Sequence, residues 1–260
     1  MKKLLEISDA HIGYELKRQG DKLVKRRAYD TKALAATLEF ARDFKPDIVL
    51  LGGDNHNMGF ISRHQLGKPR LIEGLRAIDE YKLGDTELFQ PLEALGAKEY
   101  IYLKGNHEYW VDVFLEQNPT VEGLIEPENY LNLAERGWEI INYGHLKKLG
   151  KLYFGHGENI RAQTKYVAAK AVESYGRNIV LGDKHTAQMF VSIAMADMDP
   201  HVGYVCPTMQ RMDPDYTNNS PTRQVNGFIY GYIADNGNFN LYPVIITKGK
   251  FIVNGKEYGK

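Results

Sequence analysis

The chain contains 260 residues, of which 43% are hydrophobic and 25% charged, the composition of an ordinary soluble globular protein. Basic and acidic side chains number 33 each, and this zero net charge argues against a large basic surface for duplex nucleic acid, though it allows a local patch. Cys206 is the lone cysteine and excludes an internal disulfide, and no stretch approaches transmembrane length, so we expect a cytoplasmic protein that does not associate with membranes.

The first part of the chain predicts a strand, a helix and a second, parallel strand. Leu4–Ser8 is a short apolar run typical of a buried strand, and the polar, basic segment Ile12–Arg27 is predicted to be a loop. Thr31–Phe44 carries apolar residues at helical spacing, and Pro46 closes this helix before the predicted strand Asp47–Leu51. This order is that of a right-handed crossover unit.

Residues 57–98 form a long insert between two predicted strands. We predict helices at Leu71–Tyr81 and Glu87–Leu95, broken at Gly84-Asp85, and the insert could either cap a site or pad the outside of the fold. The elements predicted beyond the insert are strands Tyr100–Leu103, Glu139–Tyr143 and Lys151–Phe154, and helices His107–Gln117, Pro127–Arg136 and Thr164–Tyr175, the last ending at Gly176.

From Ile179 onward the predicted structure is mostly antiparallel β. Strands are predicted at Gln188–Ala194, Val202–Cys206, Gly227–Ala234, Phe239–Ile246 and Phe251–Val253. We expect one domain over residues 1–260, with two packed sheets, helices on the outside, and residues 187–260 as the mostly β portion of the second sheet. The segment Met209–Thr222 is predicted to be a long loop near the site.

Polar clusters stand where five of the apolar runs end. They hold Asp9 and His11, then Asp54 and His56, then Asn106 and His107, then His156, and finally Asp183 and His185. Each cluster alone is compatible with an ordinary turn or helix start, but all five in order are not. Ligands bind where strands of an open α/β sheet end at their carboxyl edges, so these side chains are predicted to meet at one site.

This set of donors points to metal chemistry. Mixed imidazole, carboxylate and amide ligands suit Mn, Fe, Zn, Co or Ni better than Mg or Ca. Two cations about 3.5–4 Å apart would hold a phosphate and generate a bridging hydroxide that attacks phosphorus. His107 is placed to protonate the leaving oxygen as a general acid. His56 follows Asp54 closely and is predicted to contact the substrate.

The ordered series Asp9-x-His11, Gly53-Asp54-Asn55, Gly105-Asn106-His107-Glu108, Gly155-His156 and Gly182-x-x-His185 resembles the calcineurin-like metallophosphoesterases. The resemblance covers residues 4 to about 186. It implies a four-layer αββα sandwich of two mixed β-sheets flanked by helices, with two divalent metal ions at the strand ends. Mn is favoured, with Fe, Zn, Ni, Co or Mg as alternatives. The ligand sets it implies are Asp9, His11, Asp54 and His185 for one metal and Asp54, Asn106 and His156 for the other, with His107 as catalytic acid.

One position departs from the family's pattern. Asp183 stands where the first His of Gly-His-x-His is expected. Its carboxylate either ligates the second metal with a harder oxygen, which would favour Mn or Mg, or points away from it.

Three functions follow from this interpretation. The first is a phosphoesterase acting on a phosphomonoester or phosphodiester in a phosphorylated small molecule, a nucleotide or a phosphoprotein. The second is a nuclease, for which the basic residues of Ile12–Arg27 would supply charge, although the neutral total does not favour it. The third is a non-catalytic scaffold, against which the retention of His107 argues. The oligomeric state stays open.

Overall fold

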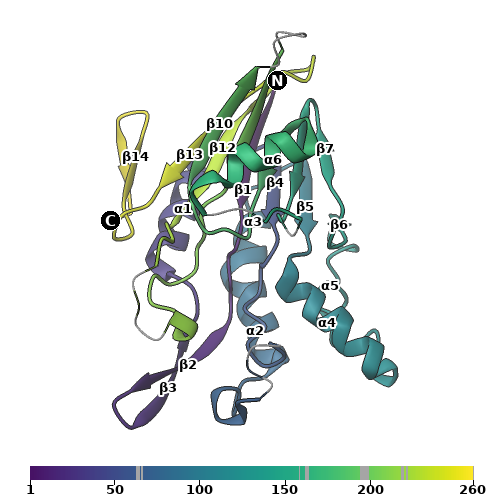
Figure 1. The fold of residues 1–260 in the computed structure, drawn as a ribbon, viewed down its shortest axis with the longest axis vertical. Helices are drawn as coiled ribbons and strands as arrows, with labels where there is room; N and C mark the ends of the chain where they lie inside the picture. The colour runs from purple at the N-terminus through teal and green to yellow at the C-terminus, as the bar shows by residue number, and fades with distance from the viewer. Residues whose placement is uncertain are drawn as a thin grey trace.

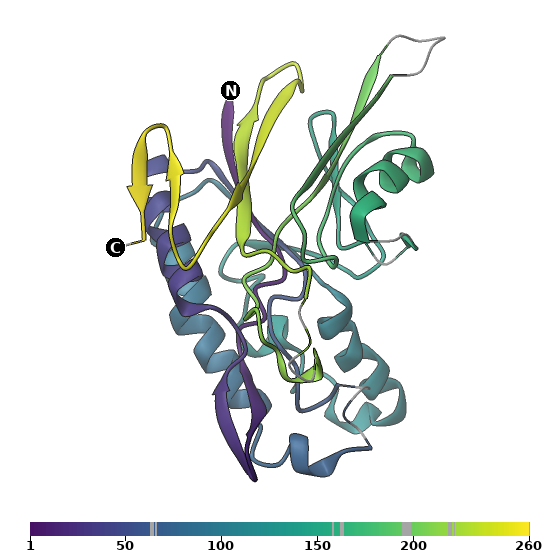
Figure 2. The ribbon, with the colours of Figure 1, turned by 60° about the vertical axis from the view of Figure 1, so that its left-hand side comes forward.

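Two β-sheets face each other at the centre of the molecule, as the computed structural model shows (Figures 1 and 2). The structure describes residues 1–62, 65, 67–157, 159–161, 164–193, 199–217, 220 and 222–259. Within the described residues, no helix is long and apolar enough to cross a bilayer.

The first sheet has six strands in the order β13-β12-β1-β4-β5-β6. Four of them run parallel, namely β1 (Lys2–Ile7), β4 (Ile48–Gly52), β5 (Glu99–Leu103) and β6 (Trp138–Ile141). The hairpin of β12 (Gly227–Ile233) and β13 (Phe239–Ile245) joins this sheet antiparallel to β1. The carboxyl ends of β1, β4 and β5 therefore lie side by side at one edge.

The second sheet has five strands in the order β10-β11-β9-β8-β7. They are β7 (Lys147–Leu149), β8 (Leu152–Gly155), β9 (Asn178–Leu181), β10 (Gln188–Ile193) and β11 (Pro200–Val205). Strands β8, β9 and β11 are parallel, while β7 and β10 are antiparallel edges. The prediction that residues 187–260 belong to the second sheet is therefore wrong for β12 and β13, which complete the first.

Successive side chains along the strands of the first sheet point to opposite faces of the sheet, and both faces are buried. Leu4, Leu50 and Ile101 pack against Phe154 and Val180 of the second sheet and form the central core. The intervening residues, such as Leu5, Val49 and Leu51, pack against the helices on the outside.

Helices form the two outer layers. The first sheet is covered by α1 (Thr31–Phe44), α2 (Ala77–Gly84), the π-turn Asp85–Phe89, α3 (Gln90–Glu93), α4 (Asn106–Gln117) and residues near α5 (Pro127–Tyr130). The second sheet is covered by α6 (Val167–Tyr175), which ends at Gly176 in the predicted left-handed cap. Figure 2 shows α1 and α6 on opposite sides of the sheet pair, and the predicted four-layer sandwich is confirmed.

The short elements complete the fold. They are the hairpins β2 (Tyr14–Gln19)–β3 (Lys22–Arg27) and β14 (Phe251–Val253)–β15 (Lys256–Tyr258), and the single-turn helices Pro69–Leu71, Pro119–Val121, Thr164–Tyr166 and Asp215–Thr217. Ala194 of the predicted strand Gln188–Ala194, and positions 218, 219 and 221 of the predicted loop Met209–Thr222, lie outside the described residues.

Three local predictions are wrong. The segment predicted to be a loop, Ile12–Arg27, contains the hairpin β2–β3. The prediction failed because long basic side chains hide the period-2 pattern that indicates a strand. The predicted break between two helices at Gly84-Asp85 is absent, because α2 continues through a π-turn into α3. Gly84 instead allows the His56 ring to pack closely against this helix, because a Cβ at Gly84 would lie 2.5 Å from Nε2 of His56. The helix predicted at Leu71–Tyr81 begins instead at Ala77.

Candidate active site

The predicted site residues converge at the strand ends through an unusual backbone conformation. Asp9, His11, Asp54, Asp183 and His185 all have positive φ, between 47° and 62°. This left-handed region is uncommon for residues other than glycine, and such strain persists only where the surroundings enforce it. It turns the chain sharply after β1, β4 and β9, so that the side chains meet at one edge.

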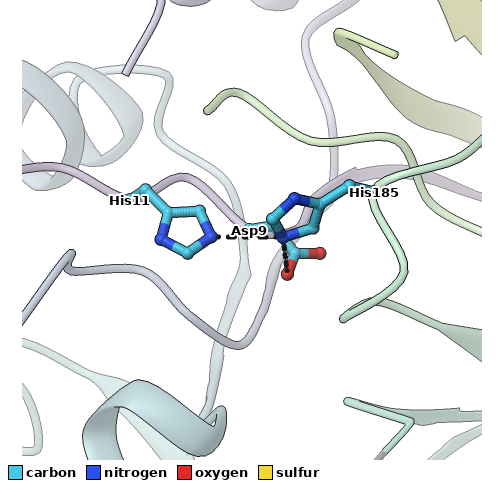
Figure 3. Close-up of side chains that lie close together, drawn as sticks. All are labelled: Asp9, His11 and His185. Carbon is cyan, nitrogen blue, oxygen red and sulfur yellow. Dashed lines mark hydrogen bonds and ion pairs between the residues drawn. The ribbon is translucent and has the colours of Figure 1, made fainter. Parts of the chain in front are cut away.

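The first group of donors comes from the ends of β1 and β9. His185 Nε2 lies 3.1 Å from Asp9 Oδ1 and 3.2 Å from His11 Nε2. Figure 3 shows these three side chains close together. Asp9 and His11 are almost completely buried. Asp9, His11 and His185 each offer one ligand atom within 4.8 Å of the others.

The second group is centred on Asp54. His156 Nε2 lies 3.2 Å from both Asp54 Oδ1 and Asn106 Oδ1. The backbone carbonyl of Gly52 contacts His156 Nδ1 at 3.0 Å and so orients the ring toward Asp54. Asp9, Asp54 and His156 also form a compact set of potential ligands. Asp9 and Asp54 thus connect the two groups.

His107 lies beside these groups. Its Nδ1 contacts the carbonyl of Asn57 at 2.6 Å, and its ring stacks on Trp110 with the centroids 3.9 Å apart. Its Nε2 lies 3.6 Å from Asp54 Oδ2, and the side chain lines the cavity described below. The proton-bearing Nδ1 is thus held by Asn57, and Nε2 is the nitrogen presented to the site.

Glu108 holds the strand ends together, a role that the sequence interpretation missed. Its buried carboxylate accepts hydrogen bonds from the backbone N–H groups of Asp54, Asn55, His56 and Gly105. A glutamate three residues into a helix, bonded back to the residue before the helix, is half of a capping box, and this spacing was the available signal.

Two predicted site residues lie elsewhere than expected. His56 is fully buried against Tyr81 and Phe89, outside the cavity lining, so its position does not support substrate contact. The Asp183 carboxylate pairs with Lys184, and its backbone N–H donates to Asp9. Asp183 lines the cavity but is not in the compact donor groups found among the described residues.

A cavity of about 550 Å³ opens above the donors. His11, Asp54, Asn106, His107, Asp183 and His185 form its floor. Its walls come from Glu15 on β2, from Ser62, Gln65 and Lys68 of the insert, and from Gln210 and Tyr216 of the segment before β12. Part of the predicted cap segment therefore reaches the site, while α2 and α3 belong to the outer helical layer.

Burial and crowding set the charges of the site. Burial would raise the pKa of the Asp54 carboxyl, but the imidazoles of His107 and His156 hold it below its ordinary value. Burial would lower the pKa of His156, but Asp54 raises it well above the usual range. Burial and the neighbouring imidazoles lower the pKa of His11 well below that range. Asp54 is therefore ionised and His11 neutral, which are the forms that ligate a metal, whereas His156 and His185 hold a proton more strongly, and a bound metal would displace it.

The donors fit divalent metal ions. Imidazole nitrogens of His11 and His185 face each other beside a carboxylate, and the buried Nδ1 of His11 finds no partner within the described part of the chain. Glycines leave room for this convergence, since a Cβ at Gly53 would lie 2.4 Å from His156 Nδ1. Mixed nitrogen and oxygen donors of this kind suit first-row transition metals.

The model of the calcineurin-like phosphoesterase family matches residues 2–203. This is most of the chain, so the protein belongs to that family, as the resemblance predicted. Enzymes of the family depend on a dinuclear metal centre. Among curated proteins, none matches this sequence.

Solved structures include two proteins to which this chain is distantly similar. A dimetal phosphatase from Danio rerio aligns with 99% of this chain and 96% of its own, at 10% identity and a TM-score of 0.42. A 5'-nucleotidase precursor from Thermus thermophilus aligns with 94% of this chain, at 12% identity and a TM-score of 0.37. This chain covers 54% of that precursor's length. The family assignment rests on the match over residues 2–203.

Removing the Glu108 carboxylate should destabilise the protein. Glu108→Ala leaves four buried N–H groups without their acceptor. Each unsatisfied group costs about 1–3 kcal/mol, so we expect a loss of about 4 kcal/mol or more in urea unfolding. Glu108→Gln keeps one carbonyl oxygen and should lose less. The control is Glu116→Ala on the exposed side of the same helix, expected within about 0.5 kcal/mol of the parent. Equal stability of the Glu108 and Glu116 variants would contradict this role.

Proposed function

We propose that this protein hydrolyses a phosphate ester at a centre of two divalent metal ions, with His107 as the proton donor. The observation that carries this proposal is the convergence of the two donor groups on Asp54, with His107 Nε2 3.6 Å from the same carboxylate. A non-catalytic scaffold would have no use for a proton donor at this place.

The proposed ligands divide as the donor groups do. Asp9, His11, Asp54 and His185 would hold one ion, and Asp54, Asn106 and His156 the other, with Asp183 as a further candidate for the second. Mn is favoured by the mixed donors, with Fe, Zn, Ni, Co or Mg as alternatives. Such ions supply Lewis-acid polarisation of the phosphate and an activated water near neutral pH.

The chain's own contribution to the chemistry is a positioned proton. The Asn57 carbonyl and the Trp110 ring hold the His107 imidazole so that Nε2 faces the cavity. A proton at Nε2 can pass to the oxygen that leaves phosphorus, which makes His107 a general acid. Burial lowers the pKa of His107, although the nearby Asp54 carboxylate opposes this effect.

The cavity favours a phosphorylated small molecule or a nucleotide as substrate over a phosphoprotein. Its volume of about 550 Å³ lies within the range of small-molecule sites. A nuclease is less favoured, because three of the six basic side chains of the β2–β3 hairpin are paired with acidic side chains of the protein. Lys25 and Arg27 pair with Asp79 and Glu87, and Arg26 pairs with Glu15 and Asp213.

Metal removal should abolish activity. Hydrolysis of nitrophenyl phosphate and of bis-nitrophenyl phosphate should vanish after exhaustive dialysis against chelator and return best with Mn²⁺. The loss of metal should be checked in the dialysed sample by mass spectrometry. Full activity in a sample shown to be free of metal would overturn the proposed function.

His107→Asn should slow turnover without removing metal. We expect kcat to fall by about 10²–10⁴-fold on an alkyl phosphate, whose leaving oxygen needs a proton. The fall should be smaller on nitrophenyl phosphate, because nitrophenolate leaves unprotonated. The same loss for both substrates, at unchanged metal content, would show that His107 is not the acid.

Asp54→Ala should cost more bound metal than Asp183→Ala. Asp54 belongs to donor groups on both sides of the site, whereas the Asp183 carboxylate pairs with Lys184. The measurement is metal per chain in purified variants, by mass spectrometry. Two tightly held ions per chain in Asp183→Ala would show that Asp183 is not a metal ligand. The same result in Asp54→Ala would show that Asp54 is not a carboxylate shared by both ions.

A further inference from the structure

The segment between β11 and β12 lies beyond the part of the chain matched by the family and contacts two of the proposed metal ligands. The Thr208 hydroxyl and the Met209 N–H both donate to the backbone carbonyl of Asp9. At the other end, the Val225 N–H donates to the carbonyl of His185. The segment is therefore anchored on the backbone of both strand ends.

One side chain of this segment reaches a ligand's imidazole directly. Gln224 Nε2 lies 2.8 Å from His185 Nδ1, the nitrogen on the far side of the ring from Asp9. The same amide contacts the Tyr216 hydroxyl at 2.5 Å and Gln210 Oε1 at 3.1 Å. Its Oε1 is buried and has no partner in the described part of the chain. The amide is thus held next to His185 with its strongest acceptor unused.

A metal ion on His185 Nε2 would use that acceptor. An imidazole that ligates through Nε2 carries its proton on Nδ1, and this N–H needs an acceptor. A half-turn of the Gln224 amide exchanges its nitrogen and oxygen, and Oε1 then accepts from His185 Nδ1. The same half-turn at Gln210 preserves the hydrogen bond between the two amides.

Two other imidazoles of the site, those of His156 and His107, have their Nδ1 bound by a backbone carbonyl. His156 Nδ1 contacts the Gly52 carbonyl at 3.0 Å, and His107 Nδ1 contacts the Asn57 carbonyl at 2.6 Å. His185 differs because its Nδ1 partner is a side chain, which substitution can change without altering the backbone.

We propose that Gln224 is a positioning residue for the metal ligand His185, held in place by Tyr216 and Gln210. This inference rests on the proposed function, since it assigns His185 to a metal ion. Tyr216 also lines the cavity, so the hydrogen-bonded chain from Tyr216 through Gln224 to His185 links the substrate space to one metal ligand.

The test compares Gln224→Met, which is similar in size but offers no comparable acceptor, with Gln224→Glu, which keeps one. The measurement is Mn²⁺ affinity of metal-free full-length protein by equilibrium dialysis. Loss of an outer partner of a ligating histidine weakens metal binding by about 10–100-fold, and we expect this for Gln224→Met. Gln224→Glu should bind Mn²⁺ at least as tightly as the parent. Tyr216→Phe, which removes one bond to the amide, should weaken binding less than Gln224→Met.

The matched control is Gln188→Met. Gln188 is also a partly buried amide, but it bonds the backbone of Ala168 and the Thr186 hydroxyl rather than a ligand, so its Mn²⁺ affinity should match the parent's. Parent-like affinity in Gln224→Met would overturn the inference, as would equal weakening in the Met and Glu variants. Should Gln224→Met fail to fold, unchanged affinity in Tyr216→Phe together with weakened affinity in Gln224→Glu would overturn it. Failure of the parent to bind Mn²⁺ would instead overturn the proposed function.

Discussion

The site depends on one buried carboxylate that is not itself a proposed ligand. Glu108 accepts from the backbone of Asp54, Asn55 and His56 after β4, and from Gly105 after β5. Parallel strands bring these two chain ends to the same edge but do not prescribe how the loops beyond them turn. Glu108 supplies that constraint, because its two oxygens can satisfy four N–H groups only when both loops take this one arrangement. The positive φ of Asp54 is stabilised in the same way.

The constraint has an electrostatic cost. Burial raises the pKa of Glu108 to about 7, and the neighbouring Asp54 adds to the effect. The backbone N–H groups oppose this shift by stabilising the ionised form. Asp9 lies close by and is also fully buried, and burial raises its pKa despite the nearby His185. Several acidic groups are therefore concentrated within a few ångströms, and bound cations would relieve their mutual repulsion. The same arrangement that strains the apoprotein therefore favours metal binding.

Much of the fold could be predicted from the sequence, since buried strands and amphipathic helices leave clear patterns. The strands β1, β4, β5, β8 and β9 and the helices α1 and α6 follow from short apolar runs and helical spacing. The assignment of β12 and β13 could not be predicted, because hydrophobic pattern identifies a strand but not its neighbour. The β2–β3 hairpin could not be predicted, because half of its strand residues are basic and hide the alternation of apolar and polar residues that marks a strand.

The candidate site shows a similar division. Ligand-type residues at strand ends could be predicted from their chemistry, and the structure brings most of them together. His56 shows the limit of adjacency in sequence. It lies two residues from Asp54, yet the turn directs its ring into the helical layer, where burial lowers its pKa to about 3. The roles of Gln224 and Tyr216 depend on contacts with residues far away in the chain, and no local pattern marks them.

The molecule separates the parts that hold metal from the parts that shape the cavity. Ligands stand on the ends of sheet strands, which are rigid and buried, while the walls come from the β2–β3 hairpin, the insert and the segment before β12. Changes in those walls can alter which substrates fit while leaving the donor groups intact, because the donor groups stand on the strand ends and not on the walls. Gln224 is not among the residues that line the cavity, but it contacts both Tyr216 of the wall and the imidazole of His185. Substitutions there should affect metal affinity and substrate fit together, and this coupling would limit how far that wall can vary.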